Sequence, residues 1–112
     1  RTMTENHERP EGEDVTQENP TENAVCAQVR VANELGLHAR PAARLAQEAQ
    51  KFESAILLVT GQQEVDAKSI LDILTLAAPR GCGLTIRASG GDARAAVERL
   101  TGLFRERFGE DK

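Results

Sequence analysis

The strongest constraint on the fold is a regular alternation of strand-like and helix-like hydrophobic patterns, which begins at Val25 and ends near Phe108. Strand-like patterns, with a period of two or a short apolar centre, occupy residues 25–32, 53–60, 63–66 and 82–88. Helix-like patterns, with apolar residues at i, i+3, i+4 and i+7, occupy about residues 39–51, 70–77 and 93–108. The order βαββαβα predicts an α+β fold, in which an antiparallel sheet carries helices on one face.

The segments between these patterns carry turn and capping signals. Gly61 and Gln62 form a turn signal between two strand-like segments, which predicts a hairpin. Ser69 stands before the second helix as an N-cap, with Asp72 three residues later in the manner of a capping box. Asp92 follows two glycines and is expected to cap the last helix. The connections therefore agree with the predicted elements.

Charge divides the 112 residues into an acidic extension and a nearly neutral domain. Residues 1–23 contain seven acids and two arginines, whereas the rest of the chain has twelve Lys and Arg against eleven acids. We expect a disordered acidic extension over 1–23, one folded domain over 24–109 and a C-terminal tail over 110–112. A solvated extension is the simplest interpretation, and docking on a partner is the alternative. The neutral domain argues against nucleic acid as a partner.

Composition excludes several other classes of protein. No apolar run reaches 18 residues and no basic leader precedes an apolar segment, so we expect neither membrane insertion nor export. The cysteines, Cys26 and Cys82, lack CxxC spacing and are too few for a disulfide scaffold, which favours a reduced, cytoplasmic setting. No second metal-ligating residue recurs at ligand spacing, so neither a metal nor a cofactor is expected. With three Phe and no Trp or Tyr, the core should consist of Leu, Ile, Val and Ala.

The segment Gly36–Ala42 (GLHARPA) is the candidate functional site. His38 lies just before a helix, where unpaired backbone N–H groups and the helix dipole attract an anion. Arg40 adds a guanidinium suited to phosphate oxygens, and Pro41 loses nothing in a first helical turn. No acid lies within the motif, and Glu34 is the nearest one in the chain. This arrangement predicts a histidine that can carry an anionic group.

GLHARPA resembles the active-site motif of the HPr family, the histidine-containing phosphocarriers of the bacterial phosphotransferase system. A second segment, Ala67–Leu71 (AKSIL), is similar to the family's signature around its regulatory serine, and Ser69 lies 31 positions after His38. The resemblance covers Val25 to Phe108. It implies an open-faced β-sandwich, with a four-stranded sheet in the order 1-4-2-3 and three helices on one face. A ferredoxin-like sandwich would show almost the same periodicity, so the resemblance decides between the two folds.

The resemblance also implies a function for these residues. Nδ1 of His38 would accept a phosphoryl group from phosphorylated Enzyme I and pass it to a sugar-specific or regulatory acceptor protein. Arg40 and the amides after His38 would neutralise the phosphate. Ser69 would be a regulatory phosphorylation site for an HPr-type kinase. Such a protein is a monomeric carrier and not an enzyme with its own turnover.

The resemblance further implies an apolar partner-binding face with a basic rim. The candidates for this face are Leu37, Ala39, Arg44, Lys68, Ile70, Leu71 and Leu74. Asp72 departs from the family, which often has a neutral or basic residue there. The loop Asn33–Leu35 resembles the nitrogen-branch carrier, whereas Arg40 and Ser69 with their neighbours resemble the sugar branch. Three hypotheses remain open: a sugar-relay carrier, a regulatory carrier acting through protein binding, and a ligand-binding sandwich with an incidental, helix-capping histidine.

By the same resemblance, the first and fourth strands of the sheet are antiparallel neighbours. Cys26 begins one of these strands and Cys82 begins the other. We therefore expect the two thiols at opposite ends of the pair, beyond the Cα separation of about 7 Å that a disulfide allows.

Overall fold

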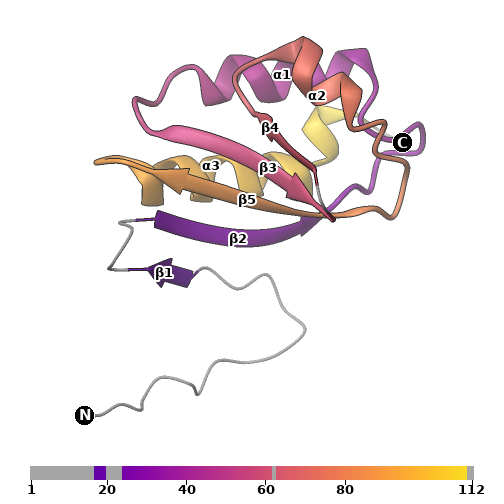
Figure 1. Ribbon diagram of the computed structural model, residues 1–112. Coiled ribbons are helices and arrows are strands. Elements are labelled where there is room, and N and C mark those ends of the chain that lie inside the picture. The colour runs from indigo at the N-terminus through magenta and orange to yellow at the C-terminus, as the bar shows by residue number, and fades with distance from the viewer. Residues whose placement is uncertain (1–16, 20–23, 62, 111–112) are drawn as a thin grey trace.

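The computed structural model describes residues 17–19, 24–61 and 63–110. In chain order its elements are β1 (Gln17–Asn19), β2 (Ala24–Arg30), α1 (Ala39–Ala49), β3 (Ala55–Thr60), β4 (Gln63–Asp66), α2 (Ile70–Thr75), β5 (Gly83–Ser89), α3 (Ala93–Arg105) and the 3₁₀ turn η1 (Arg107–Gly109) (Figure 1). Each predicted strand and helix is present, with ends that differ by a few residues from the prediction.

The strands form one antiparallel sheet in the order β1-β2-β5-β3-β4. β5 lies between β2 and β3, and it pairs with β2 from Ala24 opposite Ser89 to Arg30 opposite Gly83. The three helices lie over one face of the sheet (Figure 1). The four predicted strands are β2, β3, β4 and β5, and they stand in the predicted 1-4-2-3 order. The predicted α+β open-faced sandwich is therefore confirmed.

β1 is a fifth strand that the hydrophobic pattern did not indicate. Gln17–Asn19 pairs with the first three residues of β2, with Gln17 opposite Cys26 and Asn19 opposite Ala24. An edge strand can be recruited through backbone hydrogen bonds alone, because β2 would otherwise present unpaired N–H and C=O groups. The prediction of disorder is wrong at these three residues. The rest of the predicted extension, residues 1–16 and 20–23, lies outside the described residues.

The core lies between the sheet and the helices. Its largest fully buried apolar side chains are aliphatic and come from every predicted helix and from β3 and β5: Leu45, Ile56, Leu58, Ile73, Ile86, Leu100 and Leu103. Two aromatic residues extend this aliphatic core at the end of α3. Phe104 and Phe108 are buried and pack edge to face, with ring centroids 4.9 Å apart. The core is therefore aliphatic as expected, except at the end of α3.

α2 is shorter than predicted and buries a different set of residues. The predicted apolar stripe ran from Ile70 to Ala77, but the helix ends at Thr75 and Ala77 has a φ of 48°. Ile73 and Leu76 are buried, whereas Ile70 is 39% exposed. A six-residue helix has fewer than two full turns, so one side chain from the helix and one just after it suffice to attach it to the core.

The two cysteines are free and lie far apart along neighbouring strands. Cys26 pairs with Arg87 in the middle of β5, whereas the carbonyl of Cys82 accepts a hydrogen bond from the Val31 amide beyond the end of β2. Cys26 and Val31 are five steps apart along the chain, which is about 16 Å at the usual strand rise. The prediction that they cannot form a disulfide with each other agrees with this register.

Asp92 occupies the N-cap position of α3, but its carboxylate does not cap that helix. It accepts hydrogen bonds from the amides of Glu53 and Ser54 and from the Ser54 hydroxyl. These bonds hold the start of β3 against the start of α3. They also lower the pKa of Asp92, with the Ser54 hydroxyl as the largest cause. The predicted cap is thus a tertiary link between two elements.

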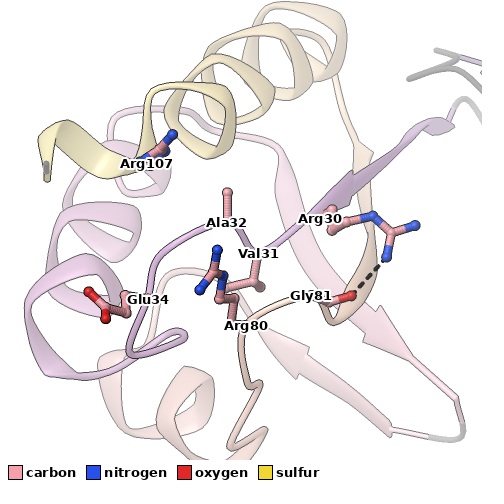
Figure 2. Close-up of a pocket in the computed structure, with 7 residues that line it drawn as sticks. All are labelled: Arg30, Val31, Ala32, Glu34, Arg80, Gly81 and Arg107. Carbon is pink, nitrogen blue, oxygen red and sulfur yellow. Dashed lines mark hydrogen bonds between the residues drawn. The ribbon is translucent and has the colours of Figure 1, made fainter. Parts of the chain in front are cut away.

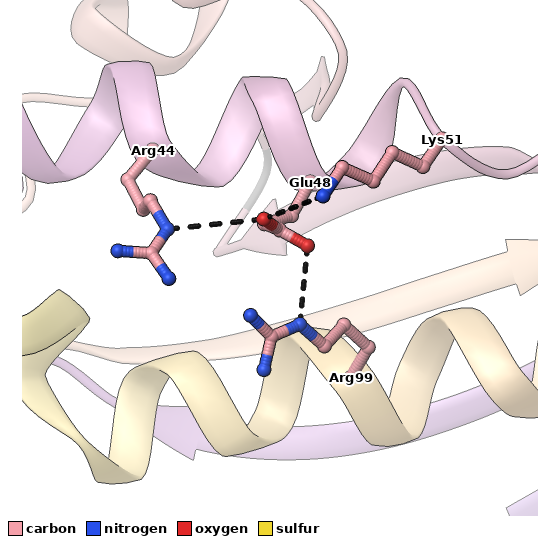
Figure 3. A network of polar contacts seen from close by, with 4 residues as sticks. All are labelled: Arg44, Glu48, Lys51 and Arg99. Carbon is pink, nitrogen blue, oxygen red and sulfur yellow. Dashed lines mark hydrogen bonds and ion pairs between the residues drawn. The ribbon is translucent and has the colours of Figure 1, made fainter.

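Glu48 is buried between α1 and α3 among three cations (Figure 3). Its carboxylate lies 3.1 Å from Arg99 Nε, 3.1 Å from Lys51 Nζ and 3.8 Å from Arg44 Nε. The hydrogen bond from Arg99 lowers the pKa of Glu48, and the bond from Lys51 adds to this effect. Because Arg99 belongs to α3 and the other partners belong to or follow α1, the cluster joins the two helices.

The Glu48→Gln variant should lose less stability on acidification than the parent protein. The folded-state pKa of Glu48 lies below its ordinary value of 4.5, so its contribution is full above that value and is lost as the pH falls through the folded-state pKa. We expect the parent to lose about 1 kcal/mol more than the variant over this range. Urea unfolding at pH 7 and at low pH measures the difference. Equal losses in the two proteins would contradict the prediction.

Candidate functional site

His38 is the N-cap residue of α1, and its side chain makes no capping hydrogen bond. The backbone carbonyl of His38 accepts the first helical hydrogen bond, from the Ala42 amide. The amides of Ala39 and Arg40 precede that bond, and Pro41 has no N–H to leave unpaired. The ring of His38 therefore stands at the positive end of an 11-residue helix, where an anion is stabilised.

The loop before His38 is held by backbone contacts with the segment after α2. The Leu37 amide donates to the Ala78 carbonyl over 2.9 Å, and the Gly36 amide donates to the Asn33 carbonyl over 3.0 Å. Gly36 has a φ of 75°, and a Cβ there would lie 2.5 Å from the Ala78 carbonyl oxygen. Only glycine allows this close approach of two backbone segments. The contact fixes the direction in which the chain enters α1.

His38 and Arg40 line one pocket of about 700 Å³ together with residues from the end of the chain. Its other lining residues are Glu34, Leu35, Phe108, Gly109 and Glu110. The His38 side chain is 35% exposed, which leaves the ring accessible. Arg40 is exposed and makes no ion pair with any residue that the structure describes. The two predicted site residues are thus brought together, and the guanidinium is available to an incoming anion.

Among the residues that the structure describes, Glu110 is the acid that contacts the His38 ring. Its Oε2 lies 3.3 Å from His38 Nε2, and its Oε1 accepts a 2.6 Å hydrogen bond from Asn33 Nδ2. A carboxylate beside Nε2 favours a proton on that nitrogen and leaves the lone pair on Nδ1. No hydrogen bond joins Nδ1 to another described residue. Glu34 is the acid nearest to the motif along the sequence, but the acid that contacts the ring is Glu110, which was expected to lie in a C-terminal tail.

A tight reversal after α3 carries Glu110 back to the site. Arg107, Phe108 and Gly109 all have positive φ, of 55°, 55° and 82°. Two non-glycine residues in this region cost about 1 kcal/mol each or more. The burial of Phe108 against Phe104 and the 2.8 Å hydrogen bond from Asn33 Nδ2 to the Arg107 carbonyl offset that cost. Asn33 is fully buried, so it links the reversal to the loop before His38.

Sequence reasoning missed Asn33 and Glu110 as site residues. Asn33 lies in the loop just before His38, but its partner Glu110 is 77 positions further along the chain, so nothing local in the sequence brings the two together. The only hint in the sequence was Asn33, a polar residue at the start of the loop before His38. The structure buries the Asn33 side chain completely. An amide with both donors satisfied in the interior is a positioning device rather than a solvated loop residue.

Ser69 caps α2 as predicted, but it does not share a pocket with His38. Its Oγ accepts from the Asp72 amide over 3.2 Å. Asp72 does not return the bond as a capping box requires, because its Oδ2 is directed to the Asp66 amide at 3.4 Å. Lys68, just before Ser69, bonds through its carbonyl to Gln50 at the end of α1. Ser69 therefore lies about one helix length from His38, near the far end of α1.

The predicted partner-binding face is divided between surface and interior. Ala39, Ile70 and Leu71 are exposed, with Leu71 76% exposed, and Leu74 is half-buried against the core. Leu37 is 4% exposed and belongs to the core, so its assignment to this face is wrong. An apolar residue in a loop has no periodicity from which its direction could be predicted.

Two predicted basic residues of the rim have partners within the fold. Lys68 Nζ donates to the Phe52 carbonyl over 2.7 Å, and Arg44 extends from α1 toward Glu48 (Figure 3). Arg40 is the predicted cation that remains unpaired among described residues. The positive charge next to His38 therefore comes chiefly from Arg40 and the start of α1.

Two further properties bear on the kind of site. In the described part of the chain, no group of three or more His, Cys, Asp and Glu side chains is arranged to hold a metal ion. Among the same residues, no helix combines the length and the apolar character needed to cross a bilayer.

Comparison with known proteins relates this site to one family. Residues 25–106 match the family model described as the PTS HPr component phosphorylation site. A phosphocarrier protein HPr of Xylella fastidiosa strain Temecula1 is 44% identical over 84 residues, which cover 75% of this chain and 94% of that protein. A phosphocarrier protein NPr of Shewanella violacea is 39% identical over 83 residues, or 74% of this chain and 91% of the relative.

Solved structures agree. The crystal structure of HPr-C-His from Thermoanaerobacter tengcongensis matches with a TM-score of 0.75 and 37% identity, and covers 78% of this chain and 98% of that one. The family match over residues 25–106 includes both sequence signatures, and the fold agrees with the solved HPr structure, so the ferredoxin-like alternative is excluded. The chain belongs to the PTS HPr family of phosphocarrier proteins, which are not enzymes in their own right.

Proposed function

We propose that the chain accepts a phosphoryl group from phosphorylated Enzyme I on Nδ1 of His38 and passes it to a sugar-specific or regulatory acceptor protein. The observation that carries this proposal is the setting of one imidazole: it stands at the start of α1, beside Arg40, with Glu110 against Nε2. Its other ring nitrogen is unoccupied by the described residues. Neutral imidazole is a good nucleophile, and the P–N bond that it forms is labile.

Each group near His38 has a distinct part in this transfer. The Nδ1 lone pair attacks phosphorus while the bond between phosphorus and the donor breaks. The Ala39 and Arg40 amides and the Arg40 guanidinium offset the charge of the incoming phosphoryl oxygens. In the onward transfer, the acceptor attacks phosphorus and the bond to Nδ1 of His38 breaks. The site must therefore stabilise the phosphoryl group without binding it tightly.

The proposal is tested with purified Enzyme I and phosphoenolpyruvate. We expect the chain to gain one acid-labile, base-stable phosphate, which a later acceptor removes. Mass spectrometry at neutral pH measures the gain of phosphate, the same measurement after acid treatment shows its lability, and addition of a purified acceptor protein shows its removal. A chain that gains no phosphate in the presence of active Enzyme I would contradict the proposal and leave only the family scaffold.

Glu110→Gln should slow phosphoryl uptake about tenfold, because the variant loses roughly one charged hydrogen bond or ion contact. The neutral amide oxygen accepts a hydrogen bond from Nε2–H more weakly than the carboxylate does, so a smaller fraction of imidazole presents its lone pair on Nδ1. Glu106→Gln, at the exposed end of α3, removes the same charge outside the pocket and is the control. Rapid-quench measurement of the phosphorylation rate checks the effect, and equal rates in the two variants would contradict the proposed role.

A second candidate function is regulatory. The NPr relative supports it, as does the loop Asn33–Leu35, which resembles the nitrogen-branch carrier. In this case the output is protein binding controlled by phosphorylation at His38 rather than sugar uptake. Sugar uptake in cells carrying the His38→Ala protein separates the two functions. Unchanged uptake would favour the regulatory function, and abolished uptake would favour the sugar relay.

Regulation at Ser69 is part of the proposal. Phosphate on Ser69 would add about two negative charges at the start of α2, beside the exposed Ile70 and Leu71. Ser69→Asp places a carboxylate there and keeps a good N-cap residue, so the fold should be preserved. We expect weaker binding of Enzyme I by calorimetry, with Ser69→Asn as the uncharged control. A Ser69→Asp protein that binds as tightly as the parent would contradict a regulatory serine.

A further inference from the structure

An exposed leucine stands at the edge of the His38 pocket. Among the residues that the structure describes, three large apolar side chains are exposed: Leu35, Ile70 and Leu71. Ile70 and Leu71 belong to the start of α2, near the far end of α1, whereas Leu35 lines the same pocket as His38. Single exposed leucines are common on protein surfaces, so it is the position of Leu35, at 76% exposure beside the proposed phosphoryl site, that needs an explanation.

The loop around Leu35 is fixed by its neighbours. Asn33 and Leu37 are buried on either side of it, and the Gly36 amide donates to the Asn33 carbonyl over 3.0 Å. The Leu37 amide donates to the Ala78 carbonyl over 2.9 Å, so the loop is attached to the segment after α2. Because both flanking residues are anchored in the fold, the Leu35 side chain is presented to solvent at a defined place.

Arg80 is presented from the segment to which this loop is attached, two residues after Ala78. Arg80 is exposed, and no ion pair joins it to a residue within the described ranges. It lines a second pocket, of about 580 Å³, and Glu34 lines both this pocket and the His38 pocket. In Figure 2 the Arg80 guanidinium lies between Glu34 and Arg30. The surface next to Leu35 therefore carries a cation that no described carboxylate neutralises.

Phosphoryl transfer between two proteins limits what the donor protein covers. The phosphorus must come within about 3 Å of Nδ1 of His38 before the new bond forms. A specific interface covers about 800 Å² of each protein, which corresponds to a patch about 16 Å in radius. Leu35 lines the His38 pocket and Arg80 lines the adjoining one, so a donor centred on His38 covers both side chains. Removal of an exposed leucine from water then favours binding.

We propose that Leu35 and Arg80 form a docking surface for phosphorylated Enzyme I, whose facing surface has an apolar patch for Leu35 and an acidic side chain for Arg80. This inference rests on the proposed function, which supplies the donor. The partner-binding face expected from the sequence contained Leu37 from this loop and neither of these two residues. Leu37 is buried in the core, whereas Leu35 is accessible. Burial of Leu35 supplies affinity, and Arg80 supplies electrostatic attraction at the rim.

The test compares two phosphoryl donors. Phosphorylated Enzyme I must dock on the chain, whereas phosphoramidate is a small molecule that transfers its phosphoryl group to imidazole and releases ammonia. We expect Leu35→Ser to raise the KM of Enzyme I for this chain about tenfold with kcat unchanged, because the lost contact is present throughout the bound reaction. Labelling by phosphoramidate should proceed at the parent rate. Leu35→Met keeps an apolar side chain of similar volume and should keep the parent KM.

The contribution of Arg80 is separated by ionic strength. Arg80→Gln should raise the same KM about threefold at low salt, and the difference should disappear at about 0.5 M salt, which screens an exposed charge. Arg87→Gln is the matched control. Arg87 alternates with the buried Ile86 and Ala88 on β5, so it lies on the face of the sheet away from the helices. Its replacement should leave the KM unchanged.

Two results would overturn the docking surface and leave the proposed function intact. One is a parent-like KM for Leu35→Ser. The other is an equal loss of labelling by phosphoramidate, which would place the effect on His38 itself and not on docking. An equal effect of Arg87→Gln would contradict the part assigned to Arg80. If Enzyme I fails to label the parent protein, the proposed function and the docking surface are both wrong. Urea unfolding shows that each variant is folded.

Discussion

His38→Ala should abolish the acid-labile phosphorylation of this protein by Enzyme I and phosphoenolpyruvate. No neighbouring side chain can replace the imidazole, because Arg40 has no nucleophilic lone pair and Glu110 would form an acyl phosphate with different lability. Phosphohistidine is hydrolysed in acid and survives in base, so the label is specific for the reaction. Mass spectrometry of the protein after incubation at neutral pH measures it directly.

The free energy of unfolding should change little in the His38→Ala variant. Loss of the phosphate label can therefore be attributed to the missing imidazole and not to unfolding. The side chain of His38 is 35% exposed and makes no capping hydrogen bond, so its removal should cost about 1 kcal/mol or less. His7→Ala replaces the other histidine of the chain and should leave the label unchanged. A full label on the His38→Ala protein, or its loss from His7→Ala, would contradict the assignment.

Gly36→Ala should destabilise the fold by about 3 kcal/mol, the largest effect that we expect from a single methyl group. The φ of 75° is unfavourable for alanine, and the added Cβ would lie 2.5 Å from the Ala78 carbonyl oxygen. To relieve this overlap, the Leu37 amide must leave that carbonyl and Leu37 must leave the core. Urea unfolding at 25 °C measures the free energy of unfolding.

Gly61→Ala is the matched control for this prediction. Gly61 also has a positive φ, of 54°, but nothing lies within 4 Å of the position that its Cβ would occupy. Alanine there should cost about 1 kcal/mol, the left-handed backbone penalty alone. Similar losses of stability for the two variants would show that contact with the segment after α2 is not what requires glycine at position 36.

Local features of the chain predicted most of the fold. The four strands, their order and the three helices agree with the hydrophobic periods and the family resemblance, and Ser69 caps α2 as its position before an apolar run indicated. His38 lies at the start of α1 because helix signals and the GLHARPA motif occupy the same few residues. Hydrophobic periodicity reports the local preference of a segment for helix or strand. It therefore predicts the position of a residue correctly where that position depends on one element alone.

Features that depend on distant contacts could not be predicted. Glu110 reaches His38 only because three residues with positive φ reverse the chain after α3. Asn33, which lies more than 70 positions earlier in the sequence, holds that reversal through hydrogen bonds. Asp92 was expected to cap its own helix, but its carboxylate serves the start of β3. These interactions link residues that are tens of positions apart. A single sequence does not show which of its distant residues come into contact.

The most direct test of the central claim is identification of the ring nitrogen that carries the phosphoryl group. Two-dimensional ¹H–¹⁵N NMR of the histidine ring, recorded on the phosphorylated full chain, distinguishes the two nitrogens by their couplings to the ring protons. With Glu110 beside Nε2, phosphate should appear on Nδ1 of residue 38. A phosphorylated Nε2, or a phosphate that leaves this ring unmodified, would contradict the account.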